Sequence, residues 1–576
     1  MNLTLWTAAG RRRFSYLLAF VACSLSAQTG DFWFPGQSLP KTVVVVNSPD
    51  NRAGLMTLQS LAGLAAQAVN EKRGDELVWV DDGNPNINIW RTNFLAAHPD
   101  VHLATSDLWT LLGRYADGRF VKGYILYKSD SSLAVATSLA GILGGVIVDE
   151  QMQPAAQAHG LKLLLDARDK SPSWCFESYK GRFNRRLICL QDPTKPHLRD
   201  LAIAQRVFTD YGADATIRRV VEWIDPLSAA LGWNGGDEFG NTDLLTRFGD
   251  FQTGTDWCMD LTVTMAGAEA VQPMKIPPFP GIAWSDRRSG VCFIDTDGDN
   301  SEWWIGNFVR NTNYWADPRR GAMPFGWSCC FAHLTQICPY AIDYALKTRS
   351  TNDSFVEAGG GYFYPDRFGM ARSNRWELLA EHTRQTWARM KKTNSRLLSF
   401  NFSQCDSPDA RRACQVIADQ TDGLLAILAF QYYPYEGGAG KVYWVRDSNG
   451  LDVPIITARY SIWEHSNQRD RSGTPAKIAR EIQQAIAGAG DQPRYDWVSV
   501  HAWSAFKQAP GVDEEAENMP QEHAEDHGGA RGFAPALWCG QRLPSSIRVI
   551  TPEEMALRIR MAHSPAQTAL FLRAAP

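Results

Sequence analysis

Short apolar runs and helical stretches alternate through the second half of the chain, and this alternation limits the possible folds more than any other feature. Each run is long enough for a buried strand and is followed by polar or aromatic residues. The runs span residues 291–294, 397–400, 424–430, 453–458, 497–500 and 547–550. Helical stretches at 376–390, 476–487 and 552–561 fall between or after them. The pattern predicts a (β/α) barrel, complete, distorted or seven-stranded, with its chemistry where the strands end.

The N-terminal half has the pattern of a parallel α/β structure. Residues 121–127 indicate a strand, serines at 129–132 can cap a helix over 133–143, and residues 146–149 indicate a return strand. This spacing is typical of a right-handed βαβ crossover in a parallel sheet. No G-x-G-x-x-G follows the first strand, so we do not predict a dinucleotide site. The Pro-rich stretch 273–280 predicts a boundary between an α/β region at 28–272 and a barrel at 273–576.

Residues 1–27 have the features of an export signal. Three arginines at positions 11–13 precede an apolar stretch at 14–25, and the small residues Ser26 and Ala27 follow. The stretch is far shorter than the roughly 20 apolar residues of a membrane span. Arg11, Arg12 and Arg13 also fit a twin-arginine signal. We therefore expect an exported protein, periplasmic or extracellular, without a transmembrane span.

Charge and cysteine pattern exclude several function classes. The 576 residues carry a net charge of −4, and no basic stripe offers the charge that nucleic acid binding needs. The 11 cysteines include no C-x-x-C pair, so zinc-ribbon chemistry is unsupported. The 21 tryptophans often stand beside polar residues, as expected when some of them line a ligand site. The oligomeric state is not predicted.

The strongest chemical signal is the acidic run that follows the first barrel strand. Asp295, Asp297, Asp299 and Glu302 fall within eight positions. The run is not an EF-hand, because Gly298 holds the fourth place instead of the sixth. Two functional interpretations stay open: paired carboxylates for acid and base work on a glycosidic bond, or a site for a hard metal ion. A solvated acidic turn is the structural alternative.

A second signal is the glycine- and tyrosine-rich loop at 357–366. Three consecutive glycines, ending at Gly361, allow positive φ and close approach of the backbone. Tyr362 and Tyr364 are two residues apart, so in an extended loop they face the same way and could stack on a sugar. A Gly-rich turn packed with aromatic residues is the alternative. Glu357, at the start of the loop, is a further candidate acid.

Other predicted strand ends carry side chains suited to sugar binding. An Arg or His beside a Trp can donate to hydroxyl groups while the indole stacks on the ring. The residues concerned are Asn401, Gln431, Arg459, Trp463, Glu464, His501 and Trp503. His523 and His527 have the spacing of a helical zinc pair but lie in a stretch of Asp, Glu, Pro and Gly that indicates a surface loop.

The string at 359–365, GGGYFYP, matches G-x-G-Y-x-Y-P, and the chain here resembles the GxGYxYP family, which is classed with the glycoside hydrolases. The likeness extends to residues 297–300, 459–463, 500–503 and 136–141. Asp260 stands where the family usually has Asn. The resemblance implies an α/β N-terminal region, a C-terminal barrel related to glycosidase and deacetylase barrels, and a link to sugar utilisation.

Three functional hypotheses follow from these residues. The first is a glycoside hydrolase without a cofactor, with its acid and base drawn from Asp297, Asp299, Glu302, Glu357 and Glu464. Its substrate-binding residues would be Gly361, Tyr362, Tyr364, Arg459, Trp463, His501 and Trp503. The second is a metal-dependent carbohydrate deacylase with a divalent cation at Asp295, Asp297 and His501. The third is a non-catalytic sugar-binding protein.

Overall fold

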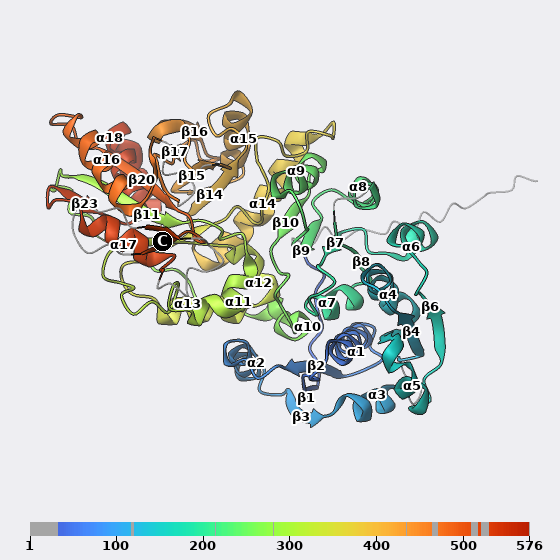
Figure 1. Ribbon diagram of the computed structural model, residues 1–576. Helices are drawn as coiled ribbons and strands as arrows, with labels where there is room; N and C mark the ends of the chain where they lie inside the picture. Colours follow the sequence, from blue (N-terminus) through green and yellow to red (C-terminus); the bar gives the residue numbers. More distant parts are fainter. Residues whose placement is uncertain are drawn as a thin grey trace, which may run out of the picture.

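The computed structural model describes residues 33–116, 120–212, 215–279, 281–433, 435–463, 470–507, 517–519 and 529–574. The export segment, Glu464, His523 and His527 lie outside the described residues. Within them, no helix combines the length and apolarity needed to cross a membrane. Figure 1 shows the N-terminal units on one side of the molecule and the C-terminal barrel on the other, with β9 and β10 between them.

The N-terminal half contains three small parallel sheets. The first has strand order β2-β1-β3 and the second β5-β4-β6, while the third has order β10-β9-β7-β8. The strands of these sheets are β1 (Thr42–Asn47), β2 (Glu76–Asp81), β3 (His102–Ser106), β4 (Gly123–Tyr127), β5 (Gly145–Asp149), β6 (Leu163–Asp166), β7 (Leu187–Leu190), β8 (Phe208–Asp210), β9 (Ala229–Gly232) and β10 (Phe251–Thr253). Their helices are α1 (Arg52–Asn70), α2 (Pro85–Ala97), α3 (Leu108–Ala116), α4 (Asp130–Leu143), α5 (Gln153–Ala158), α6 (Pro172–Tyr179), α7 (Arg199–Ala204), α8 (Ala215–Trp223), α9 (Glu238–Phe248) and α10 (Leu261–Thr264).

The predicted βαβ unit is confirmed by β4, α4 and β5. Strands β4 and β5 pair in parallel over five residues, and α4 crosses between them. Helix α4 begins with a capping box in which the Ser129 side chain accepts from the backbone N–H of Ser132. It ends at Gly144, whose φ of 75° suits a residue without a side chain. The serine signal at the start of the helix therefore corresponds to a real cap.

The C-terminal half forms a curled sheet of eleven strands within the described residues. Its strands are β11 (Ser289–Asp295), β12 (Phe325–Cys329), β13 (Asp353–Glu357), β14 (Leu397–Phe402), β15 (Ala426–Gln431), β16 (Val442–Arg446), β17 (Asp452–Thr457), β18 (Tyr460–Ile462), β19 (Ser472–Gly473), β20 (Tyr495–Val500) and β23 (Ile547–Val549). Its helices are α11 (Ser301–Ile305), α12 (Phe331–Ile337), α13 (Pro339–Thr348), α14 (Arg375–Thr393), α15 (Pro408–Asp419), α16 (Pro475–Ala487), α17 (Phe533–Gln541), α18 (Pro552–His563) and α19 (Pro565–Ala574). A separate hairpin pairs β21 (Ala505–Lys507) with β22 (Glu517–Met519).

The barrel is distorted and only partly closed. Strands β17 and β18 follow each other along the chain; β17 pairs with β15, and β18 pairs with β20. Each of these two pairings covers three residues, and β17 does not pair with β18 among the described residues. On the other side, β12 meets β11 only at Ile294, and β23 pairs with β11 at Ser289–Val291. The predicted fold, a parallel α/β region followed by a distorted (β/α) barrel, is confirmed.

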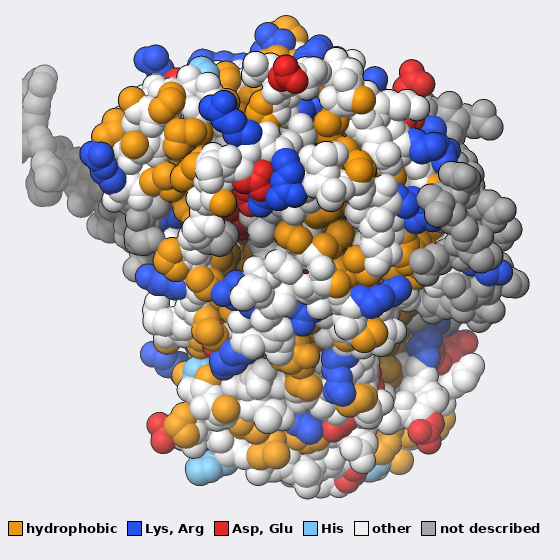
Figure 2. All heavy atoms as spheres, turned by 90° about the vertical axis from the view of Figure 1, so that its left-hand side faces the viewer, with side chains coloured by type: hydrophobic (Ala, Val, Ile, Leu, Met, Phe, Trp, Pro, Cys, Tyr) orange, Lys and Arg blue, Asp and Glu red, His pale blue; other side chains and the backbone are white. Residues whose placement is uncertain are grey.

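The outer face of the barrel is chemically mixed. Figure 2 shows hydrophobic, basic and acidic side chains interspersed on this face, with lysines and arginines single or in small groups. All ten cysteines of the described residues are buried and free. Buried thiols of this kind behave as small hydrophobic side chains.

Candidate functional site

The carboxyl ends of the barrel strands face the carboxyl ends of β7, β9 and β10, and a cavity of about 440 Å³ lies between them. Parallel sheets place their ligand sites at this end. The lining residues of the barrel side are Thr296, Asp297, Asp299, Asn300, Glu302, Tyr362, Asn401, Phe430, Tyr435, His501 and Trp503. The third N-terminal sheet contributes Lys195, Trp233, Glu238, Asp256 and Trp257. The cavity is therefore built by two units of the chain.

The acidic run enters the cavity in a tight turn after β11. Gly298 packs so closely on β12 that a Cβ there would overlap the backbone of Ser328 and Cys329. Asp297 has a φ of 62°, which is uncommon for a residue with a side chain. The turn places Asp297 and Asp299, one on each side of Gly298, on the cavity wall.

Asp297 is held by hydrogen-bond donors. The hydroxyl of Thr296 donates to its Oδ2, and the side chain of Trp503 also donates to the carboxylate. Burial raises the pKa of Asp297 to about 7, and the nearby Glu238 charge acts in the same direction. The donors favour the ionised form and offset part of this shift. Asp297 is thus a desolvated carboxylate with partners suited to its charge.

Asp299 has a contrasting environment. Within the described residues its carboxyl receives no hydrogen bond from another residue, although it lies on the cavity wall. Burial raises the pKa of Asp299 well above its usual range, and repulsion by Asp297 raises it further. Two neighbouring carboxyl groups with different partners lose their protons at different pH values. Among the described residues, Asp299 is the member of the pair without a donor from another residue that would favour its ionised form, which suits a group that carries a proton.

Glu238 approaches the pair from the opposite unit. It is the first residue of α9, and its Oε1 accepts a hydrogen bond of 2.7 Å from the Tyr362 hydroxyl. The Tyr362 ring stacks on Trp233, with ring centroids 5.9 Å apart and planes 7° apart. Burial raises the pKa of Glu238, while the Tyr362 bond lowers it. Glu238 and Asp297 lie close enough for their charges to interact.

A second acidic pair, Asp256 and Glu302, lies on the same cavity wall. The Lys195 ammonium pairs with Asp256 and sits 4.0 Å from the ring centroid of Trp257. The backbone N–H of Trp257 donates to Glu302 Oε2 at 2.9 Å. Burial, followed by repulsion from Asp256, raises the pKa of Glu302 well above its usual range. Trp257 keeps 56% of its surface exposed, so it offers an open aromatic face.

Asn401 and His501 are placed on the cavity wall as the strand-end argument predicted. Asn401 is 8% exposed, and its Oδ1 has no hydrogen-bond partner within the described residues. His501 Nδ1 lies 2.7 Å from the Ser504 hydroxyl. Trp503 packs edge-on against Trp303 with centroids 4.9 Å apart. A buried acceptor without a donor is unfavourable, so the Asn401 oxygen marks a place where a ligand could donate.

One part of the glycine- and tyrosine-rich loop lines the cavity, and the other part is buried in the protein interior. Tyr362 lines the cavity, whereas Tyr364 is fully buried beside it, with the two hydroxyls 3.2 Å apart. The backbone of Tyr362 exchanges two hydrogen bonds of 2.9 Å with Gln252 at β10. Gly361 has a φ of 123°, and a Cβ there would meet Phe251 at 2.6 Å. The loop therefore joins the barrel to the third N-terminal sheet as well as contributing one cavity residue.

Glu357 is placed away from the cavity lining, at the carboxyl end of β13. Its two carboxylate oxygens accept from the backbone N–H groups of Ala332 and Gly360, at 3.0 and 3.2 Å. Burial raises the pKa of Glu357 to about 7. Its carboxylate is engaged in holding helix α12 and the glycine loop in place.

Arg459 and Trp463 are also not among the cavity lining residues. The Arg459 guanidinium donates to the Ala439 carbonyl at 2.8 Å and to the Tyr460 hydroxyl at 3.0 Å. Trp463 is 9% exposed and stacks on Tyr435, which itself lines the cavity. Both residues lie behind the cavity wall.

The alternative metal site does not assemble at the predicted residues. The Asp295 Oδ1 accepts from the Ser328 backbone N–H at 2.5 Å, and Asp295 is not part of the cavity lining. Within the described part of the chain, no group of three or more His, Cys, Asp or Glu side chains could hold a metal ion. The deacylase hypothesis therefore lacks a donor set among these residues.

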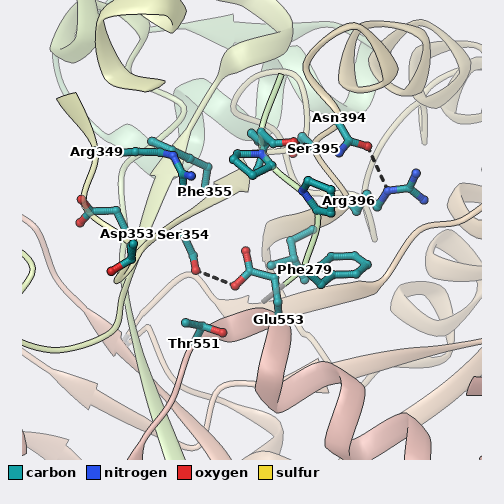
Figure 3. A pocket seen from close by; sticks show the side chains of 15 residues that line it. Phe279, Arg349, Asp353, Ser354, Phe355, Asn394, Ser395, Arg396, Thr551 and Glu553 are labelled. Carbon is teal, nitrogen blue, oxygen red and sulfur yellow. Dashed lines mark hydrogen bonds between the residues drawn. The ribbon is translucent and has the colours of Figure 1, made fainter. Parts of the chain in front are cut away.

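A smaller hollow of about 180 Å³ lies at the opposite end of the barrel (Figure 3). It is lined by residues at the starts of β13 and β14 and by Pro277, Pro278 and Phe279 of the linker. Figure 3 shows the Ser354 hydroxyl directed at Glu553, to which it donates at 2.6 Å. In parallel barrels this end stabilises the fold, and the carboxyl end holds the chemistry.

Sequence reasoning missed the cavity residues of the N-terminal units. Lys195, Trp233 and Glu238 follow short strands, but they meet the barrel only through tertiary packing. Asp256 and Trp257 follow β10, which has only three residues and was not predicted as a strand. A search for polar and aromatic residues after β7 and β9, applied as it was in the barrel, could have found Lys195 and Trp233.

Three family models match the chain in consecutive segments. Residues 121–183 match the second domain of the GxGYxYP N-terminal region, residues 185–266 match the GxGYxYP third domain, and residues 289–512 match the "GxGYxYP putative glycoside hydrolase C-terminal domain". The chain belongs to the GxGYxYP family. The matches to the third and C-terminal domains include the two walls of the cavity.

A solved structure shows the same fold. It is the crystal structure of a "putative hydrolase" from Bacteroides thetaiotaomicron VPI-5482, with a TM-score of 0.73 and 20% sequence identity. The alignment covers 91% of this chain and 96% of that chain. No curated protein sequence matches the chain. At 20% identity the likeness supports the fold alone.

Proposed function

We propose that this GxGYxYP protein hydrolyses a glycosidic bond in the cavity between the barrel and the third N-terminal sheet. The observation that carries the proposal is the Asp297–Asp299 pair, two neighbouring carboxyl groups with contrasting hydrogen bonding. Glycoside hydrolysis needs one carboxyl group that keeps its proton and one that is ionised. The exposed face of Trp257, together with Trp233 and Trp503, supplies aromatic surface for a sugar ring.

In this proposal Asp299 is the general acid. Its carboxyl gives a proton to the leaving oxygen as the bond between that oxygen and the anomeric carbon breaks. Asp297 is the carboxylate that stabilises the positive charge developing at the anomeric carbon. A water molecule then bonds to that carbon and gives its proton to the Asp299 carboxylate, which restores the acid. The donors from Thr296 and Trp503 favour the ionised form of the Asp297 carboxyl group and fix its orientation. Of the other predicted acids, Glu357 does not line the cavity, and Glu464 lies outside the described residues. Glu302 lines the cavity but is paired with Asp256.

The test is turnover of a panel of oligosaccharides by the parent and by two single variants. Asp297→Asn and Asp299→Asn change charge with little change in size, and each should lower turnover by about a hundredfold or more. Asp419→Asn is the matched control, since Asp419 lies at the end of α15 and its carboxylate accepts from Gln415. Full activity in both cavity variants would refute the assignment.

The other hypotheses become outcomes of the same panel. A parent protein that binds glycans without cleaving any of them would favour the sugar-binding alternative. Release of acyl groups, lost on chelation and restored by a divalent cation, would favour the deacylase. Neither has a specific observation in its favour among the described residues.

We also propose that the protein is exported by the signal at residues 1–27, with a twin-arginine route as one option. The ground is the sequence pattern described above. Mass spectrometry of the N-terminus of secreted or periplasmic material tests this proposal. An intact Met1 in exported protein would refute cleavage of the signal.

A further inference from the structure

We propose that the cavity takes a sugar with a protonated amine, a hexosamine, and that Glu238 binds its ammonium group. This inference rests on the proposed glycosidase function of the same cavity. It concerns Glu238, one of the cavity carboxyl groups that the proposed mechanism does not use. Glu238 lies opposite the Asp297–Asp299 pair and belongs to a different unit of the fold.

The first observation is the charge of the cavity wall. Five carboxyl groups line it, against one lysine, among the described residues. That lysine, Lys195, is already paired with Asp256. Burial raises the pKa values of four of the five, namely Glu238, Asp297, Asp299 and Glu302, so their ionisation in the cavity is unfavourable without a cation. A cationic ligand would make that ionisation easier, and an anionic sugar would make it harder.

The second observation is the hydrogen-bond balance. Two donors of the wall are directed at protein acceptors: the Tyr362 hydroxyl at Glu238, and the Trp503 side chain at Asp297. Acceptors are left over, because Asn401 Oδ1 is buried without a partner among the described residues. Asp299 receives no hydrogen bond from another residue within the described chain. A ligand that brings donors would satisfy these acceptors, and an ammonium group brings three.

The third observation is the geometry at Glu238. Its Oε1 is fixed by the Tyr362 hydroxyl at 2.7 Å, and no second hydrogen bond reaches its carboxylate within the described residues. Tyr362 is itself positioned by stacking on Trp233 and by its backbone pairing with Gln252. The carboxylate is therefore oriented in advance and keeps one oxygen for a ligand. A preorganised acceptor of this kind favours a charged donor.

The experiment measures the binding of free D-glucosamine by calorimetry near pH 6, where its amine is protonated. Glucose, N-acetylglucosamine and glucuronate serve as matched sugars of neutral or negative charge. A hydrogen bond to a charged group predicts that glucosamine binds about tenfold or more tightly than glucose. Glu238→Gln keeps the acceptor for Tyr362, and it should reduce the preference to roughly twofold or less.

The control variant is Asp237→Asn, which makes the same change in charge one residue earlier. Asp237 caps α9 by accepting from the Gly240 N–H, and Asn caps helices equally well. Asp237 is exposed and does not line the cavity, so this variant should keep the preference for glucosamine. Loss of the preference in both variants would mean that the overall negative charge near the cavity selects the sugar. A contact at Glu238 would then be ruled out.

The two proposals fail in different ways. Equal binding of glucose and glucosamine, or tighter binding of glucuronate, overturns the amino-sugar inference and leaves hydrolysis of neutral glycans intact. Binding of none of the sugars, with no cleavage of any glycan, overturns both proposals. If Glu238→Gln abolishes cleavage of neutral and amino glycans alike, Glu238 belongs to the catalytic pair and the inference is wrong.

Discussion

Replacing Gly360 by Ala should destabilise the protein strongly, because the middle glycine of the GxGYxYP loop has neither conformational nor steric room. Its φ is 75°, in the left-handed region that side chains disfavour. A Cβ there would lie 2.5 Å from Thr386 Oγ1 and 2.9 Å from Trp33 Cη2. Both neighbours are buried, so neither can simply turn into solvent.

The expected magnitude follows from these two costs. The left-handed conformation costs a residue with a Cβ about 1–2 kcal/mol, and overpacking in a well-packed core costs about 1–3 kcal/mol. The free energy of unfolding should therefore fall by about 2–5 kcal/mol. At an unfolding entropy of ~2.1 cal/mol/K per residue, each kcal/mol corresponds to roughly 1.6 °C for a unit of about 300 residues, so Tm should fall by about 3–8 °C.

Calorimetry of the parent, Gly360→Ala and Gly113→Ala measures this effect. Gly113 lies in α3, and no atom comes within 4 Å of the position that a Cβ would take there. Ala at this position should be neutral or stabilise the helix by about 0.5–1 kcal/mol. If Gly360→Ala shifts Tm no more than Gly113→Ala does, the loop is not a structural joint.

Three further predictions concern the cavity. Tyr362→Phe removes the hydrogen bond to Glu238 but keeps the backbone pairing, so sugar affinity should fall about tenfold with little change in Tm; an unchanged affinity would contradict this. Burial raises the pKa of Asp297 to about 7, so the folded state holds a proton that the unfolded chain releases from about pH 4. The contribution of Asp297 to stability should therefore fall as the pH rises from about 4 to 7, and Asp297→Asn should remove this slope of about 1.4 kcal/mol per pH unit; the same pH dependence in parent and variant would count against a desolvated carboxyl group. Dialysis against a chelator should leave turnover unchanged, and a loss restored by added metal would revive the deacylase.

The fold was predictable to the extent that strands are apolar and flanked by turn signals. Strand β13 was missed because it begins and ends with acids, and burying them depends on partners that are distant in sequence. Asp353 accepts from the Trp327 indole, and Glu357 accepts from the backbone of α12 and the glycine loop. The run 357–366 therefore looked like an isolated loop, although it continues a buried strand.

Only the barrel wall of the candidate site could be predicted from the sequence. Asp297, Asp299, His501 and Trp503 follow recognisable strands, and the structure places all four on one cavity wall. Their catalytic and binding roles remain predictions. The opposite wall could not be predicted, because Glu238 meets the barrel only through the packing of two units.

The most direct test of the central claim compares leaving groups in the Asp299→Asn variant. An acid that protonates the leaving oxygen is needed for a sugar leaving group but hardly for 2,4-dinitrophenolate, which leaves without a proton. We predict a loss of about a hundredfold or more on the oligosaccharide and less than about tenfold on the dinitrophenyl glycoside. Asp297→Asn should impair both substrates. Equal losses on both substrates for Asp299→Asn would contradict its role as general acid.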